Sequence, residues 1–171
     1  MSQLDALSNT LIRRAVVDEA AIIARVLYQA FVEFEAQYTA AAFAATTPTS
    51  DQIRERWSDG PVWVAVQGNQ IIGTIAAVPK SEGLYIRSMA VLSSHRGNGI
   101  GQLLLQAVEK FAIARDIQRM FLSTTPFLAG AIRLYERFGF HRTNASPHKL
   151  FGTLLFDMVK QLEPADPVSR D

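Results

Sequence analysis

The chain contains no cysteine among its 171 residues. Disulfides, thiolate nucleophiles and cysteine-ligated zinc are therefore excluded from any mechanism. An excess of charge is also missing, because 17 basic side chains stand against 16 acidic ones, for a net charge of +1. Non-specific binding of nucleic acid depends on clustered lysine and arginine, so we expect no nucleic-acid partner.

Long hydrophobic runs are absent as well. No run approaches the ~18 apolar residues that a membrane span needs, and the first five residues lack the basic segment and apolar stretch of a signal peptide. We therefore expect a cytoplasmic protein with no membrane partner. The three histidines, His95, His141 and His148, show no metal-ligand spacing, so no metal is expected.

Hydrophobic residues, in contrast, make up 49% of the chain and charged residues 19%. A chain of about this length can bury roughly 68–70% of its unfolded surface. One domain with a full core is therefore predicted over residues 1–162. Residues 163–171 contain two prolines and no aromatic residue, and we expect them to form a flexible tail.

Apolar patterning predicts alternating strands and helices. A β-branched run predicts a first strand over 10–17, and an apolar stripe at helical spacing predicts a helix from an Asp18 cap to about Tyr38. Thr49 and Gln52 have capping-box spacing for a short second helix. The later strands are predicted at 62–66, 71–78, 84–91, 119–124, 140–141 and 150–158. A long helix is predicted after the strand over 84–91, and another helix over 128–138.

This order, β-α-α-β-β-β-α-β-α-β, predicts a mixed α/β fold with a central twisted sheet of about six to seven strands and helices on both faces. No charged residue lies between Pro61 and Pro79. The two strands that flank Gly68 and Asn69 are therefore predicted to form a hairpin in the middle of the sheet.

A glycine-rich segment over residues 96–101 joins the fourth strand to a long helix. Glycine lets successive N–H groups converge, and the helix dipole adds positive potential, so the segment predicts an anion cradle suited to phosphate. A tight turn that needs glycine for geometry alone is the simpler alternative. No Lys-Ser/Thr pair follows as in a P-loop, and Gln102 stands where the dinucleotide fingerprint requires glycine.

The pattern Arg96-x-x-Gly99-x-Gly101 resembles the R/Q-x-x-G-x-G/A signature of the GNAT acetyltransferase superfamily. The resemblance covers about residues 10 to 158. It includes Ser88-Met-Ala-Val91 before the loop, Ala131-Ile-Arg-Leu-Tyr-Glu-Arg-Phe-Gly-Phe140 after it, and Ile71-Ile-Gly-Thr-Ile75. It implies a GNAT-like fold and an N-acetyltransferase that moves the acetyl group of acetyl-CoA directly to a primary amine of a small molecule or a peptide N-terminus.

The resemblance also implies where the co-substrate binds. Loop N–H groups would hold the pyrophosphate with Arg96 on the phosphate side, and the main chain of a fourth strand that splays from the fifth would hydrogen-bond the pantetheine arm. Leu128 replaces an asparagine that contacts pantetheine in many members, and Thr124 or Thr125 is an open substitute. The expected cofactor-binding residues are Met89, Ala90, Val91, Arg96, Gly97, Asn98, Gly99, Ile100, Gly101 and Leu128.

Acetyl transfer to an amine has two proton demands, since an alkylammonium of pKa near ~10 must lose a proton and the departing thiolate must gain one. The resemblance implies that Tyr135 is the acid, although its position on an apolar stripe also suits simple packing. Glu82 is our candidate base. Glu33, Glu35 and water remain alternatives.

The acceptor is left open. Phe31, Phe34, Tyr38 and Phe43 would suit a partly apolar amine, although core packing explains the first two equally well. Two other functions remain alternatives: a non-catalytic acyl-CoA-binding sensor, and a nucleotide-binding protein that uses the loop for ATP or NAD. A homodimer is a further expectation.

Overall fold

The structure is a computed structural model that describes residues 2–164; most of the expected tail, residues 165–171, lies outside the described residues. The helices are α1 (Gln3–Ser8), α2 (Ala20–Phe31), α3 (Ala40–Thr46), α4 (Ser50–Glu55), α5 (Ile100–Ile113) and α6 (Ala129–Phe138). Short 3₁₀ turns are η1 (Val17–Glu19), η2 (Val32–Gln37), η3 (Trp57–Asp59) and η4 (Ser93–His95). The strands are β1 (Thr10–Arg14), β2 (Val62–Gln67), β3 (Gln70–Lys80), β4 (Gly83–Val91), β5 (Arg119–Thr124), β6 (His141–Arg142), β7 (His148–Leu150) and β8 (Thr153–Gln161).

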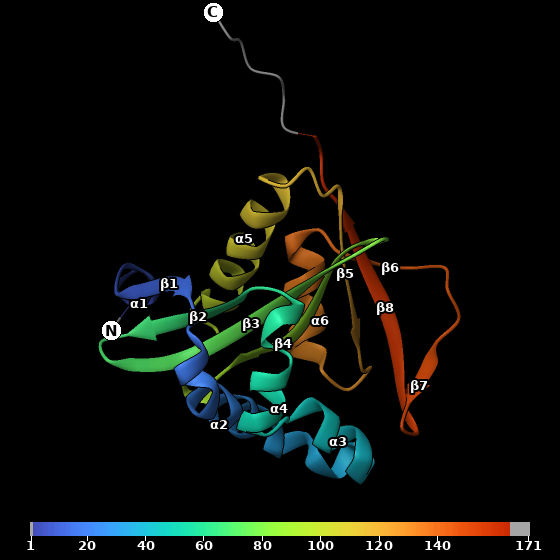
Figure 1. Ribbon diagram of the computed structural model, residues 1–171, viewed down its shortest axis with the longest axis horizontal. Coiled ribbons are helices and arrows are strands. Elements are labelled where there is room, and N and C mark those ends of the chain that lie inside the picture. The colour runs from blue at the N-terminus through green and yellow to red at the C-terminus, as the bar shows by residue number, and fades with distance from the viewer. Residues whose placement is uncertain (1, 165–171) are drawn as a thin grey trace, which may run out of the picture.

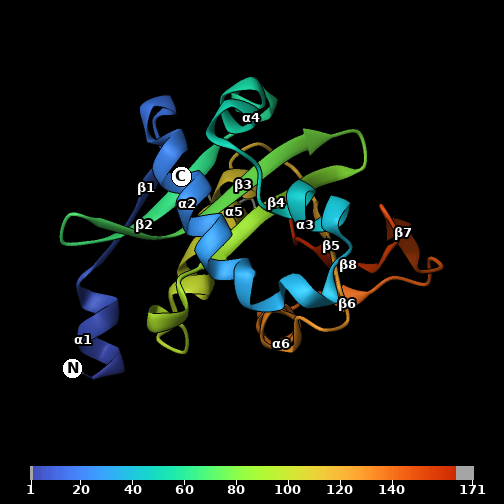
Figure 2. The same cartoon turned by 90° about the horizontal axis from the view of Figure 1, so that it is seen from below.

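Within the described residues the strands form one mixed sheet in the order β1-β2-β3-β4-β5-β8-β6, with β7 also paired to β8. The pairs are antiparallel except β4 with β5, which is parallel. Figures 1 and 2 show α2 and α4 together on one face of the sheet and α5 on the other, where α6 packs against it. The predicted mixed α/β fold is confirmed, with β6 and β7 adding short strands at the far edge.

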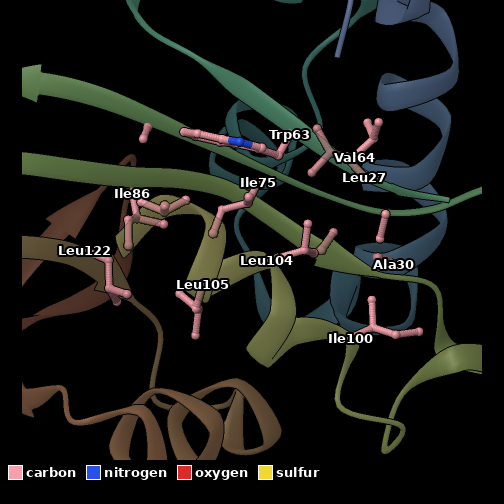
Figure 3. Packing of buried hydrophobic residues seen from close by; sticks show 14 of the residues in the cluster. Leu27, Ala30, Trp63, Val64, Ile75, Ile86, Ile100, Leu104, Leu105 and Leu122 are labelled. Atoms are coloured by element: carbon pink, nitrogen blue, oxygen red, sulfur yellow. The ribbon is translucent and has the colours of Figure 1, made fainter. Parts of the chain in front are cut away.

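The predicted hairpin is confirmed as β2 and β3, which lie inside the sheet between β1 and β4. Gly68 turns the chain between them with φ +56°. The uncharged sequence of both strands follows from this position, because α2 covers one face and α5 the other. The core is built here, with Leu27, Ile72, Ile75, Leu104 and Leu105 almost completely buried. Figure 3 shows side chains of α2, the central strands and α5 gathered around the sheet.

The first long helix ends earlier than predicted, because α2 stops at Phe31 and continues as the 3₁₀ turn η2. Arg96 Nη2 donates a hydrogen bond of 2.7 Å to the carbonyl of Ala30. In a continuous α-helix that carbonyl would accept the N–H of Phe34. A side chain that takes an acceptor from the helical ladder is a recognised cause of such a break. The prediction that Asp18 caps this helix is also wrong. The side chain that accepts a backbone N–H at this turn is that of Glu19, whose carboxylate accepts the N–H of Val16.

Other boundaries differ in smaller ways. The first strand stops at Arg14, and two helices, α1 and α3, lie where none was predicted. The stretch predicted as one strand over 150–158 is a hairpin, because Phe151 (φ +45°) and Gly152 (φ +87°) reverse the chain between β7 and β8. The Thr49–Gln52 capping box is confirmed, and it starts α4.

Candidate functional site

The sheet opens between β4 and β5. These strands pair at only two positions, Leu84 with Met120 and Tyr85 with Phe121. Beyond this point β4 stays paired with β3, while β5 stays paired with β8 through Thr124. Among the described strands, none pairs with the outer edge of β4 from Ile86 to Val91, so its main-chain groups face the opening.

A β-bulge marks the start of this free edge. The β3–β4 register shifts between Ala76, which pairs with Arg87, and Thr74, which pairs with Ala90. Ser88 and Met89 of β4 lie opposite the single residue Ile75 of β3, and Ser88 has φ +51°. Positive φ in a residue with a side chain costs free energy and is found most often at functional sites, where bulges are also common. The bulge therefore re-aims the backbone of β4 beside the opening.

The glycine-rich loop follows directly and ends at the start of α5. Gly97 and Gly99 have φ +77° and +79°, and Gly99 is the N-cap of α5. A Cβ on Gly97 would meet nothing within 4 Å, so the loop has open space on that side. The first N–H groups of a helix have no acceptor inside it, and α5 is long enough to add its dipole. The loop thus presents convergent donors beside the free edge of β4.

Two neighbours hold this loop in place. A Cβ on Gly99 would lie 3.0 Å from Leu7 Cδ2 of α1, and a Cβ on Gly101 would lie 2.6 Å from Leu134 Cδ2 of α6. Glycine at 101 is therefore required by the close approach of α6 to α5. Ile100, the first residue of α5, is 1% exposed and anchors the helix start in the core.

Arg96 connects the loop to the end of α2. Its Nε donates to the carbonyl of Val91 at 3.1 Å, its Nη2 donates to Ala30, and its Nη1 pairs with the carboxylate of Glu33. The guanidinium is thus engaged by protein groups on the side away from the loop glycines. Arg96, a candidate phosphate contact, and Glu33, a candidate base, therefore form an ion pair with each other.

Tyr135 lies on α6, packed edge-on against Phe140 with ring centroids 5.9 Å apart. Its side chain is 8% exposed. Burial raises the pKa of its hydroxyl above the ordinary value of a phenol, and the nearby phenols of Tyr38 and Tyr85 add to the rise. Tyr38 comes from the segment after η2 and Tyr85 from β4, so phenols of three elements lie near enough to act on one another electrostatically. A hydroxyl held in its neutral form can donate a proton.

The turn between β5 and α6 carries two residues of interest. Leu128 is the N-cap of α6, makes no side-chain cap bond, and donates its N–H to the carbonyl of Thr125 at 3.2 Å. Thr125 is 2% exposed, and its Oγ1 accepts and donates no hydrogen bond within the part of the chain that the structure describes. A buried hydroxyl that makes no hydrogen bond is costly; the nearby phenol is that of Tyr38, whose pKa is raised by burial and lowered in part by the Thr125 hydroxyl.

Glu82 lies apart from these groups. It is exposed in the β3–β4 turn, at the opposite end of β4 from the bulge. Seven residues separate it from Met89, which is about 23 Å at the rise of a strand. The structure does not bring Glu82 together with Tyr135 or the loop. Glu35 lies on η2 and is exposed.

A groove lies between the segment after η2, the turn that follows β5, and the β7–β8 hairpin. Its volume is about 450 Å³, and it is lined by Gln37, Thr39, Pro126, Phe127, Gly152, Thr153 and Leu154. Phe127 stacks edge-on against Tyr38 at 4.8 Å and lies 6.4 Å from Phe34. Phe34 and Tyr38, two of the four aromatic residues noted in the sequence, thus pack behind Phe127 in the wall of the groove. Phe43 is buried and packs against Tyr38, and Phe31 packs against the core.

Three residues near the groove had no signal in the sequence. Ser123 Oγ donates to Asp157 Oδ1 at 2.6 Å, and His148 Nδ1 lies 4.0 Å from the same oxygen. Burial raises the pKa of Tyr85, and the Ser123 hydroxyl beside it offsets part of that rise. These residues come from β4, β5, β7 and β8, and only the fold places them side by side.

Among the described residues no helix is long and apolar enough to cross a membrane. A search of the same residues finds no group of three or more histidine, aspartate and glutamate side chains with the geometry to hold a metal ion.

Comparison with known proteins agrees with this geometry. The family model described as "Acetyltransferase (GNAT) family" matches residues 26–140. N-acetyltransferase 8B of Rattus norvegicus is 34% identical over 103 residues, covering 57% of this chain and 45% of that protein. N-acetylaspartate synthetase of Homo sapiens is 31% identical over 102 residues, covering 58% and 34%. The chain thus spans half or less of the length of these curated relatives.

Among solved structures, the PaiA N-acetyltransferase of Thermoplasma acidophilum, crystallised with coenzyme A, superposes with a TM-score of 0.76. The match covers 89% of this chain and 98% of that one at 16% identity, which supports the fold alone. The family model, in contrast, covers well over half of the chain, from the middle of α2 to the end of the segment that carries Tyr135. With the open β4 edge, the glycine loop and the family match in agreement, the chain belongs to the GNAT acetyltransferase family.

Proposed function

We propose that the protein is an N-acetyltransferase that moves the acetyl group of acetyl-CoA directly to a primary amine. The observation that carries this proposal is the unpaired edge of β4 leading into a glycine loop at the N-terminus of α5. An extended amide chain can add to a free strand edge, and the pyrophosphate at its end then meets convergent N–H groups.

The residues present fit coenzyme A. The pantetheine arm carries amides that match the main chain of Met89, Ala90 and Val91, and the Thr125 hydroxyl is a buried polar group in need of a partner on the β5 side. We assign the pyrophosphate to the backbone N–H groups of Gly97 to Gly101. When bound, acetyl-CoA supplies an activated thioester.

The role that we propose for Arg96 differs from the phosphate contact expected from the sequence. Its three contacts hold the loop against α2, so we propose that it shapes the loop and that the backbone makes the phosphate contacts. Leu128 has no polar side chain to offer pantetheine, and in its place we propose Thr125 from the pair of threonines left open in the sequence.

Tyr135 is proposed as the general acid. Its hydroxyl is protonated at neutral pH, as any phenol of pKa near ~10 is, and burial raises its pKa further. Donation of that proton to the departing thiolate would lower the barrier to C–S cleavage. The acceptor amine enters from the groove beside Phe127, on the opposite side from the loop.

The first experiment measures thiol release from acetyl-CoA with a broad panel of amines. Turnover on one class of amine supports the enzyme. Tight coenzyme A binding without turnover on any amine would instead support the acyl-CoA sensor. Thermal shifts distinguish the proposed enzyme from a nucleotide-binding protein, because a ligand that binds the native state raises the melting temperature. Stabilisation by ATP or NAD but not by coenzyme A would contradict the proposal.

The choice between a small molecule and a peptide N-terminus, a cytoplasmic location and a homodimer remain predictions. Size-exclusion chromatography with light scattering tests the dimer.

A further inference from the structure

The two strands whose ends line the groove also carry the Ser123–Asp157 pair. Thr153 lines the groove, and Asp157 lies four residues later on the same face of β8, since residues of equal parity share a face. On the other wall, Pro126 and Phe127 follow three and four residues after Ser123. Ser123 and Asp157 are direct partners across β5 and β8. A carboxylate therefore lies further along the strands that lead away from the groove.

The Ser123–Asp157 pair lies beside the opening between β4 and β5. Ser123 is two residues beyond Phe121, the last β5 residue paired with β4. Tyr85 shares a face of the sheet with this pair, because its partner Phe121 and Ser123 have equal parity on β5. Burial raises the pKa of Tyr85, and the Ser123 hydroxyl offsets part of that rise.

The Asp157 carboxylate is held on one oxygen. Ser123 Oγ donates to Oδ1, and His148 Nδ1 is nearest to the same oxygen. The side chain is 34% exposed. Within the described residues no arginine or lysine nitrogen lies within 4.0 Å of it, so its negative charge is not neutralised by a permanent cation. Oδ2 is the oxygen left for a ligand.

Two ion pairs on the α2 side use other charges. Arg87 of β4 bonds to Asp59 at 2.8 Å, and Glu33 is paired with Arg96. Among the described residues Asp157 has no arginine or lysine partner, so its carboxylate can accept a cation from outside the chain.

We propose that Asp157, oriented by Ser123, binds the ammonium group of the acceptor and takes a proton from it, and that the acceptor is a primary amine carried on an aromatic or apolar body. This inference rests on the proposed function. The apolar body would lie toward Pro126 and Phe127, in the turn that follows β5. A carboxylate that accepts hydrogen bonds from an ammonium ion makes a charge-assisted contact, which is stronger than a neutral one.

The protons balance in this scheme. One ammonium proton moves to Asp157 Oδ2, which leaves a lone pair on the amine nitrogen. The new N–C bond forms with this pair as the C–S bond of the thioester breaks, and the Tyr135 hydroxyl protonates the sulfur. The second proton of the nitrogen then restores the phenol. Asp157 returns its proton to solvent through its exposed side.

The test compares binding of two small probes in the presence of coenzyme A, so that no transfer occurs. The probes are 2-phenylethylammonium and its neutral analogue 2-phenylethanol, measured by calorimetry on the wild-type protein and on Asp157→Asn. Asparagine keeps an oxygen for Ser123 and nearly the same volume. We expect the wild type to prefer the ammonium by about tenfold or more, and Asp157→Asn to reduce that preference to within about twofold, since one charged contact is lost.

Matched variants separate charge from structure. Asp51→Asn removes an exposed carboxylate on α4 and should keep the wild-type preference. Ser123→Ala should weaken the preference by freeing the carboxylate, and Ser123→Thr, which retains a hydroxyl, should restore it. With acetyl-CoA, Asp157→Asn should lower kcat/KM by about 10²-fold, as for a lost general base, with unchanged coenzyme A affinity.

An ammonium preference that survives in Asp157→Asn would overturn the inference, as would a wild type that binds both probes equally. If the wild type prefers the ammonium yet releases no thiol with any amine, the amine site is supported and the proposed enzyme is not. Failure of the inference and failure of the proposed function are therefore distinguishable.

Discussion

The two ends of the site are built in different ways. On the α5 side the proposed ligand contacts are main-chain groups, set by a bulge at Ser88 and by left-handed residues in the loop. On the α2 side the proposed contacts are side chains from β5, β8 and the segment after η2. A backbone site leaves a local pattern of glycines, whereas a side-chain site assembled from distant strands leaves none. Variants that separate the two ends should therefore affect different measurements.

The largest effect is expected at Tyr135, where the two ends meet. Tyr135→Phe keeps the ring packed on Phe140 and removes the proton donor. We expect kcat to fall by about 10²–10⁴-fold, as for a lost general acid, with little change in coenzyme A affinity. Tyr28→Phe, at a tyrosine that is 49% exposed, is the control. A kcat within a fewfold of the wild type, where chemistry limits turnover, would leave Tyr135 with a packing role only.

The next effect isolates the backbone end. Gly99→Val places a branched side chain at φ +79°, beside Leu7 and at the start of α5. We expect coenzyme A affinity to fall by about tenfold or more, equivalent to about 1.4 kcal/mol, because the loop must change its conformation. Gly68→Val is a matched control, since it imposes a similar backbone strain at φ +56° in the β2–β3 turn with open space around it. Equal affinities in the two variants would remove the loop from the binding site.

A smaller effect concerns the link between the ends. Arg96→Ala removes the bonds from the loop to Val91 and Ala30. We expect coenzyme A affinity to fall about two- to twelvefold, the range of one hydrogen bond of about 0.5–1.5 kcal/mol. Arg54→Ala, which breaks an exposed pair with Asp51 at 3.0 Å, should bind as the wild type does. Isothermal titration of each variant with coenzyme A decides, and equal affinity in both would show that the loop holds its shape without Arg96.

The smallest effect is on stability at high pH. Above about pH 10 the unfolded chain releases the Tyr135 proton, while the folded protein, with a raised pKa, retains it. The folded state then binds more protons, so its stability falls as pH rises from about 10 toward the folded-state pKa. Tyr135→Phe should remove up to about 1.4 kcal/mol per pH unit of that decline in urea unfolding at pH 9 to 11. Identical slopes would indicate that the hydroxyl titrates as it does in water.

The turn into α5 was predictable because its information is local. The glycine-rich segment joins β4 to α5 where the sequence placed it, with Gly99 left-handed at the helix start, and the hairpin at Gly68 lies where the uncharged run placed it. The early end of α2 was not predictable, since it depends on Arg96, 66 residues from Ala30 along the chain. The Ser123–Asp157 pair spans 34 residues and has no fixed spacing. Glu82 directly precedes the predicted fourth strand, and the length of that strand separates Glu82 from the opening.

The tie between Arg96 and Ala30 has a consequence for the order in which ligands act. The guanidinium occupies the carbonyl that the N–H of Phe34 would need for another turn of α2. A ligand that binds the loop in the shape that Arg96 holds would favour the short form of α2, and with it the present positions of Phe34 and Tyr38 behind the wall of the acceptor groove. The two ligands are then thermodynamically linked through one arginine, and by reciprocity each would change the affinity of the other by the same factor.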